Sequence, residues 1–114
     1  MMAEKPYACG VGPAFDVVGG KWKAVILWEL NAGPVRFGEL KRRVVGVTEK
    51  MLIQQLRELE RDSLITREVF SQVPPRVDYA LTSWGATLNA ALAPVADWGE
   101  AYARTMGRYP GAAS

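Results

Sequence analysis

The sequence predicts a mainly helical α+β fold, in which two short helices joined by a tight turn are followed by a β-hairpin. Apolar residues recur three and four positions apart between residues 37 and 59, which indicates helices. After Asp62 the apolar period changes to two, and a stretch with two prolines divides the alternating region into two strands. A helix pair with a glycine in its turn, followed by a hairpin, is the pattern of a winged helix-turn-helix domain.

The length and composition indicate one globular domain. The chain has 114 residues, one cysteine, no histidine and a net charge of +2. Residues 36–61 hold seven basic and four acidic residues, so the positive charge is concentrated there. No long apolar run and no signal peptide stand out, and we therefore expect a cytoplasmic protein outside the membrane. A single cysteine cannot form an internal disulfide. One thiol and no histidine argue against a metal site. No cofactor is expected.

The N-terminal third is expected to contain an arm and two helices. Residues 1–12 carry proline and glycine without periodicity and predict a flexible arm, before a domain over residues 13–107 and a tail over residues 108–114. Proline is tolerated in a first helical turn, and a short helix is predicted over residues 13–18. Residues 21–31 carry an apolar stripe too wide for a surface helix, which predicts a central core helix.

The next two predicted helices form the helix-turn-helix. The first presents Phe37, Leu40 and Val44 on one side, and residues 45–47 link it to the second. The second helix runs to residue 62, with Thr48 as its N-cap and the leucines at positions 52, 56 and 59 directed into the core.

The outer face of that second helix carries long hydrogen-bond donors. At about 100° per residue, the side opposite the leucines holds Lys50, Gln54, Arg57 and Arg61. Such a face suits the major groove of DNA, whereas a solvated amphipathic helix is the alternative for this segment by itself. The neighbouring helix and hairpin favour DNA binding.

The hairpin and the last helix complete the domain. Strands are predicted over residues 64–70 and 77–81, with Arg76 beside the turn, where it could enter a narrow minor groove. A helix is predicted from the Thr82 cap to about residue 106, with a kink or break at Pro94. Its large apolar residues predict a dimer interface, although packing onto the domain's own core is an alternative. The expected interface residues are Leu88, Leu92, Val95, Trp98 and Tyr102.

Several short motifs occur in order with a characteristic spacing. They are Gly19-Gly20-Lys21-Trp22-Lys23, Arg36-Phe37 with Glu39-Leu40, Met51-Leu52 with Gln55-Leu56, Leu59-Glu60, Val73-Pro74-Pro75-Arg76-Val77-Asp78-Tyr79 with Leu81-Thr82, Gly85, and Trp98-Gly99. Over about residues 9–102 the chain resembles the HxlR-type transcription regulators. The resemblance implies a winged helix-turn-helix homodimer, distantly similar to MarR-type regulators, that binds pseudo-palindromic operator DNA.

Three positions depart from the family pattern. Cys9-Gly10 stands where the family usually has Cys-Pro, and Gly38 replaces a serine or threonine whose hydroxyl could contact a phosphate. Ser63 stands where glycine is favoured, so it must adopt a turn conformation that glycine takes more readily.

Position and chemistry together predict a set of DNA-binding residues. Gln54 can pair with adenine and Arg57 or Lys50 with guanine, while Thr48 lies where a helix N-terminus can meet a phosphate. The full predicted set is Arg36, Lys41, Arg42, Arg43, Thr48, Lys50, Gln54, Arg57, Gln72 and Arg76. For each basic residue the alternative is a solvated surface charge.

The effector is left open by the sequence. The resemblance implies that Cys9 senses oxidants or electrophiles, and nearby Lys5, Lys21 and Lys23 would favour its thiolate. An inert, buried thiol is the alternative. A small molecule bound near the dimer helices, close to Phe15, Trp22, Trp28 and Trp98, is a second possibility for the effector.

Other classes of protein fit less well. The sequence has no phosphate-binding glycine loop and no nucleophile with a paired base, so we do not expect an enzyme. A winged helix that contacts only proteins is the remaining alternative.

Overall fold

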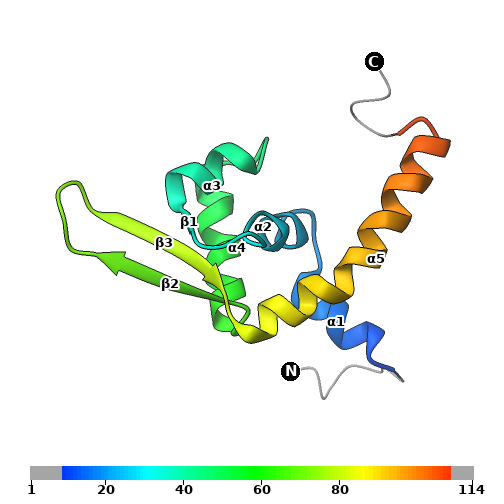
Figure 1. Ribbon diagram of the computed structural model, residues 1–114, viewed down its shortest axis with the longest axis horizontal. Coiled ribbons are helices and arrows are strands. Elements are labelled where there is room, and N and C mark those ends of the chain that lie inside the picture. Colours follow the sequence, from blue (N-terminus) through cyan, green and yellow to red (C-terminus); the bar gives the residue numbers. More distant parts are fainter. Residues whose placement is uncertain (1–8, 109–114) are drawn as a thin grey trace.

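In the computed structural model, which describes residues 9–108, five helices and three strands follow one another along the chain. Their bounds are α1 Val11–Val18, α2 Lys23–Glu29, β1 Val35–Arg36, α3 Phe37–Arg43, α4 Glu49–Arg61, β2 Ile65–Phe70, β3 Arg76–Leu81 and α5 Ser83–Thr105. The predicted mainly helical α+β fold is confirmed. Figure 1 shows the β2–β3 hairpin extending from one side of the helical body and α5 extending from the other.

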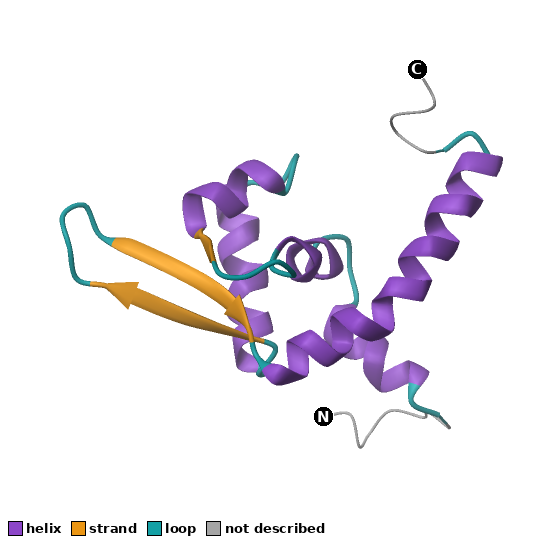
Figure 2. Ribbon diagram, viewed as in Figure 1, coloured by secondary structure: helices purple, strands orange, loops and turns teal. Residues whose placement is uncertain are grey.

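The three strands form one antiparallel sheet in the order β1-β3-β2. Strands β2 and β3 pair from Ile65 opposite Leu81 to Phe70 opposite Arg76, and this long hairpin is the wing (Figure 2). The two-residue strand β1 adds to its other edge, with Val35 opposite Tyr79. Strand β1 was not predicted from the sequence, because two residues are too few to show an alternating pattern.

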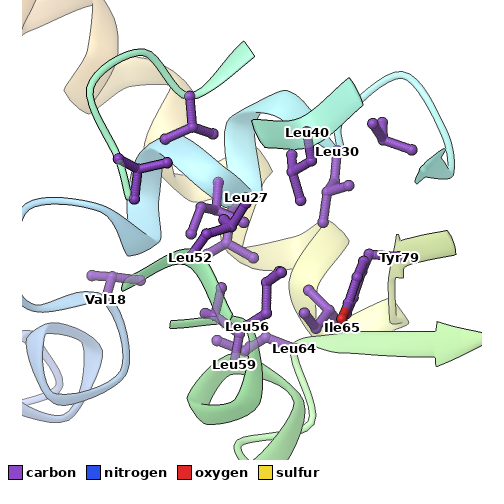
Figure 3. Close-up of a cluster of buried hydrophobic side chains, with 14 residues drawn as sticks. Val18, Leu27, Leu30, Leu40, Leu52, Leu56, Leu59, Leu64, Ile65 and Tyr79 are labelled. Carbon is purple, nitrogen blue, oxygen red and sulfur yellow. The ribbon is translucent and has the colours of Figure 1, made fainter. Parts of the chain in front are cut away.

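The core lies where α2, α3 and α4 meet the root of the sheet. Leu52, Leu56 and Leu59 of α4 are fully buried, as predicted, and they lie beside Leu27 and Ile65 (Figure 3). Fully burying a side chain of this size stabilises the fold by about 1.5–3 kcal/mol. The buried apolar residues are Val18, Ile26, Leu27, Leu30, Val35, Leu40, Val44, Val47, Leu52, Leu56, Leu59, Leu64, Ile65 and Tyr79.

The end of α4 is closed by a Schellman motif. The Leu64 amide donates to the Leu59 carbonyl at 3.0 Å, and the Ser63 amide donates to the Glu60 carbonyl at 3.0 Å. This motif needs a left-handed residue after the helix, and Ser63 has a φ of 64°. The expectation that Ser63 takes a conformation better suited to glycine is therefore confirmed.

Thr82 joins three elements at the base of the wing. Its hydroxyl donates to the Ser63 carbonyl at 2.6 Å and accepts from the Gly85 amide at 3.1 Å, which caps α5. Its backbone amide donates to the Leu64 carbonyl at 3.0 Å. The end of α4, the start of β2 and the start of α5 are thus connected through one residue.

Some predicted boundaries were wrong. Helix α1 begins at Val11 rather than at residue 13, because proline is tolerated anywhere in a first turn where its missing amide has no helical partner. Residues 11–12, which were predicted as part of the arm, are therefore helical, and residues 1–8 and 109–114 lie outside the described residues. Helix α2 covers Lys23–Glu29 instead of residues 21–31. Arg76 is the first residue of β3, whereas the strand was predicted to begin at residue 77.

Helix α5 continues through Pro94 without a break. Figure 1 shows that it changes direction along its length, which is the kink rather than the break that the sequence analysis allowed. Asn89 anchors its first half: the side-chain amide donates to the Leu27 carbonyl of α2 at 2.8 Å.

Candidate nucleic-acid interface

Helix α4 presents a polar face to solvent above its buried leucines. Lys50, Gln54 and Arg57 are all exposed on this face, as predicted. The Thr48 hydroxyl accepts a hydrogen bond from the Met51 amide at 3.1 Å, which confirms Thr48 as the N-cap. Within residues 9–108, Lys50 and Arg57 take part in no ion pair, so their charges are available to a ligand.

Gln54 is held by its neighbours on one side. Its Nε2 donates to the Glu58 carboxylate at 2.7 Å, and the other oxygen of that carboxylate lies 2.6 Å from Lys23 Nζ. Hydrogen bonds from Lys23 and then from Gln54 lower the pKa of Glu58 below its ordinary value. Lys23 was predicted to lie near Cys9, but its ammonium is buried and paired with Glu58 instead.

The basic cluster at the end of α3 is partly neutralised by an acid of the same helix. Glu39 accepts hydrogen bonds from Arg42 and from Arg43 Nε, the latter at 3.1 Å, and these bonds lower its pKa. Lys41 is exposed and forms no ion pair with any other residue of the described chain. Of the three predicted phosphate clamps, Lys41 therefore carries the least compensated charge.

A cleft of about 800 Å³ separates the helix-turn-helix from the wing. Four arginines line it: Arg36 from β1, Arg57 from α4, Arg67 from β2 and Arg76 from β3. Glu60 is the acidic residue of the lining, so positive charge dominates. The structure thus brings together Arg36, Arg57, Arg76 and Gln72, which were predicted separately as DNA-binding residues.

The four arginines are not equivalent. Arg76 forms two 3.1 Å hydrogen bonds to the Asp78 carboxylate, and its guanidinium lies 4.3 Å from the centre of the Phe70 ring. Arg36 and Arg67 are exposed, and no ion pair to them is found in the described part of the chain. Arg76 is therefore the most constrained of the set.

Arg67 was missed by the sequence analysis. It lies opposite Tyr79, which is buried, so both side chains point to the same face of the sheet. The signal was present in the alternation of Ile65, Arg67 and Val69, because a charged residue on the apolar face of a strand is unusual and marks a polar cleft or a ligand.

Exposed apolar side chains also lie outside the helix-turn-helix and the wing. They belong to α1, α2 and α5, with Met106 just after α5: Val11, Phe15, Val25, Trp28, Trp84, Val95, Trp98, Tyr102 and Met106. Trp98 is 66% exposed, and its ring stacks on Tyr102 with 4.8 Å between centres. Leu88, also predicted for the dimer interface, packs against the chain's own core.

A shallow apolar groove of about 270 Å³ runs between α2 and α5. Trp28, Val25, Leu92 and Val95 are among its lining residues. Of the four aromatic residues predicted for an effector pocket, Trp28 lines this groove, whereas Trp22 packs against the core.

Cys9 lies just before α1 and is exposed. The alternative of a thiol buried beneath the first helix is therefore wrong. Lys21 lies over the Trp22 ring at 4.8 Å, and Lys5 is outside the described residues.

Metal-ligating side chains do not gather in the described part of the chain. Among residues 9–108, acidic residues and cysteine form no cluster of three that could hold a metal ion. No helix in that part of the chain is both long enough and apolar enough to cross a membrane.

The interface has the arrangement of a helix-turn-helix with a wing, and comparison with known proteins agrees. A family model described as HxlR-like helix-turn-helix matches residues 17–106. The chain belongs to the HxlR family. Its domain is that of a helix-turn-helix transcriptional regulator.

Individual relatives and solved structures support the same assignment. The chain is 48% identical over 94 residues to YdeP, an HTH-type transcriptional regulator of Bacillus subtilis strain 168, covering 82% of this chain and 73% of YdeP. The redox regulator HypR in its reduced form is 40% identical with a TM-score of 0.81, covering 89% of this chain and all of that one. A MarR-family regulator from Porphyromonas gingivalis W83 is 35% identical with a TM-score of 0.79, and the match covers 84% of this chain and 94% of that one.

Proposed function

We propose that the protein is a homodimer that binds a specific operator in double-stranded DNA, with α4 in the major groove. The observation that carries this proposal is the polar face of α4, where Lys50, Gln54 and Arg57 stand exposed over a fully buried row of leucines. Gln54 offers both a donor and an acceptor to adenine, and Lys50 and Arg57 offer donors to guanine or to phosphates.

The phosphate contacts come from the elements on either side of α4. Lys41, Arg42 and Arg43 at the end of α3 meet one strand, and the Thr48 hydroxyl still has its proton to donate. The cleft with Arg36, Arg67 and Arg76, together with Gln72, faces the backbone beside the wing. Its excess positive charge supports this role because phosphodiester groups are anionic.

The second copy covers the apolar surface of α1, α2 and α5. Leu92, Val95, Trp98 and Tyr102 form the centre of this contact, whereas Leu88 packs against the chain's own core. A single chain leaves Val95, Trp98 and Tyr102 exposed to water, which supports a partner of the same kind. Two-fold symmetry then places the recognition helices roughly 34 Å apart, one turn of DNA, or at a multiple of it.

An electrophoretic mobility shift separates this proposal from a winged helix that contacts only proteins. The probe is the promoter region of the protein's own gene, with a shuffled duplex of the same length as competitor. We expect a discrete shifted band that unlabelled promoter DNA removes and shuffled DNA does not. Equal competition by both duplexes, or no shift, would exclude sequence-specific binding.

For the effector we propose oxidation of Cys9 as the leading candidate. The thiol is exposed, and HypR, which shares the fold at 40% identity, is described as a redox regulator and is known in reduced and oxidised forms. A small apolar molecule in the groove between α2 and α5 is the second candidate, favoured by the exposed Trp28 and Val95 of that groove.

A further inference from the structure

A chain of three side chains connects the core to the face of α4 that is proposed to read DNA. Lys23 begins α2 and is 8% exposed, and its ammonium lies 2.6 Å from Glu58 Oε1. Glu58 Oε2 in turn accepts the hydrogen bond from Gln54 Nε2 at 2.7 Å. Glu58 is therefore bonded on both oxygens, from the core side by Lys23 and from the solvent side by Gln54.

This chain fixes which way the Gln54 amide faces. A carboxylate without a proton only accepts hydrogen bonds, so the NH₂ group of Gln54 must turn toward Glu58 and its Oε1 must turn away. Hydrogen bonds from Lys23 and Gln54 keep Glu58 ionised by lowering its pKa, and the ionised form is the one that imposes this orientation. A free glutamine on a helix surface would populate both orientations.

We propose that Glu58 is a specificity-determining residue that acts through Gln54, by holding its amide in the one orientation that recognises adenine. In that orientation Oε1 accepts from adenine N6, and the second proton of Nε2 donates to N7. The flipped amide would present donor and acceptor in the wrong order. The inference rests on the proposed DNA-binding function and adds a residue that never touches the DNA.

Lys23 has a supporting part in this arrangement. The buried ammonium gives Glu58 a fixed partner, so the carboxylate does not swing into solvent as an exposed acid of a helix would. Removing Glu58 alone would leave Lys23 buried without a partner, which is strongly destabilising. The test therefore starts from Lys23→Met, which removes the buried ammonium before Glu58 is changed.

Two variants lack Lys23 and differ in the acceptor at position 58. The single variant Lys23→Met keeps the carboxylate of Glu58, which only accepts hydrogen bonds and is 26% exposed to solvent. The double variant combines Lys23→Met with Glu58→Leu, which removes the acceptor. Each is made with and without Gln54→Ala. The affinity of each is measured for the duplex that the unmodified protein selects from a random pool, and for a scrambled duplex of the same length and composition.

We expect the double variant with Glu58→Leu to lose about 3- to 10-fold in the ratio of selected to scrambled affinity, as for one net hydrogen bond. The single variant Lys23→Met should keep that ratio within a factor of about two, since its acceptor-only carboxylate remains. With Gln54→Ala in place, the single and the double variant should have equal ratios. Equal loss in both variants, or the same difference between them when Gln54→Ala is present, would overturn the inference.

Nuclear magnetic resonance of the free protein provides a measurement that needs no DNA. The side-chain amide protons of Gln54 should differ from those of Gln72, an exposed residue of the wing turn, and should approach them in the double variant with Glu58→Leu. Gln54 resonances that already match Gln72 in the unmodified protein would overturn the inference. If the amide is held but no duplex is preferred over scrambled DNA, the proposed function fails, and the specificity role fails with it.

Discussion

The backbone of Gly85 lies against the carbonyl oxygen of Leu64, with no room for a side-chain atom between them. A Cβ on residue 85 would overlap that oxygen and would lie 3.1 Å from Leu81 Cδ2. This contact seats the first turn of α5 on the start of β2, so the position accepts only glycine.

Gly85→Ala should therefore lower the free energy of unfolding by about 1–3 kcal/mol, as overpacked cores do, despite the better helix propensity of alanine. Gly38→Ala is the matched control, because a Cβ at this position of α3 would meet nothing within 4 Å. The control should gain about 0.5–1 kcal/mol. Urea denaturation of both variants measures the difference, and two variants of equal stability would contradict the expectation.

Ser63→Gly should stabilise the protein by about 0.5–1 kcal/mol. Ser63 is held at a φ of 64°, a left-handed conformation in which a Cβ costs about 1–2 kcal/mol. Glycine removes this cost, but part of the gain in stability is lost because glycine also raises the conformational entropy of the unfolded chain. Ser71→Gly, in the exposed turn, has only the entropic effect and should be neutral or destabilising. Thermal melts of the two variants compare them, and a lower melting temperature for Ser63→Gly would count against the strain.

Gln54→Ala should weaken operator binding by about 1–3 kcal/mol and leave binding to random DNA nearly unchanged. The reason is that Gln54 is proposed to contact a base rather than a phosphate. Fluorescence anisotropy with both duplexes gives the two affinities. Equal losses on the two duplexes would refute the base-reading role.

Lys41→Ala should weaken binding to operator and random DNA alike and reduce the slope of log affinity against log salt by about one unit. Arg42→Ala should change the slope less, because Arg42 already shares the Glu39 carboxylate with Arg43. Titrations at several salt concentrations give the slope for each variant. A larger change in slope for Arg42→Ala than for Lys41→Ala would make Arg42, not Lys41, the stronger phosphate contact.

Trp98→Glu should convert a dimer into a monomer, since it places a charge in the centre of the proposed contact. Val45→Glu is the control: Val45 is 84% exposed in the turn of the helix-turn-helix, away from α5. Sedimentation at micromolar concentration should show a dimer for the unmodified protein and for the control. A monomeric unmodified protein would rule out the homodimer.

Cys9→Ser should bind the operator normally but fail to respond to diamide. The exposed thiolate is proposed to attack the oxidant and to form a disulfide with the second subunit, which would change the spacing of the two wings. Diamide titration is followed by DNA binding and by mobility on a non-reducing gel. If oxidised and reduced protein bind equally, the groove between α2 and α5 becomes the better effector site.

Local signals in the sequence predicted α4 nearly to the residue. The Thr48 cap, the leucine spacing and the turn at Ser63 all lie within the helix or next to it, so no distant contact was needed. The wing could be predicted equally well from the sequence, since apolar and polar residues alternate in its two strands and a proline-containing turn separates them. Even the kink at Pro94 follows from one residue and its missing amide.

Contacts between distant segments could not be predicted in the same way. Lys23 was predicted to lie near Cys9, and its burial depends on Glu58, which is 35 residues later (58 − 23). The cleft required Arg36 of β1 and Arg67 of β2 to line one hollow although their strands are not neighbours, and β1 itself exists only because β3 offers an edge. In each case the deciding partner is set by the tertiary fold.

The hydroxyl of Thr82, bonded at once to Ser63 and Gly85, has a mechanical consequence. Because one residue clamps the end of α4, the root of the wing and the start of α5, these parts form a stiff corner. We therefore expect a rotation of the far half of α5 to be transmitted to the wing and to the end of α4 together. Bending of α5 itself is expected farther along the helix, around Pro94, where a backbone hydrogen bond is missing.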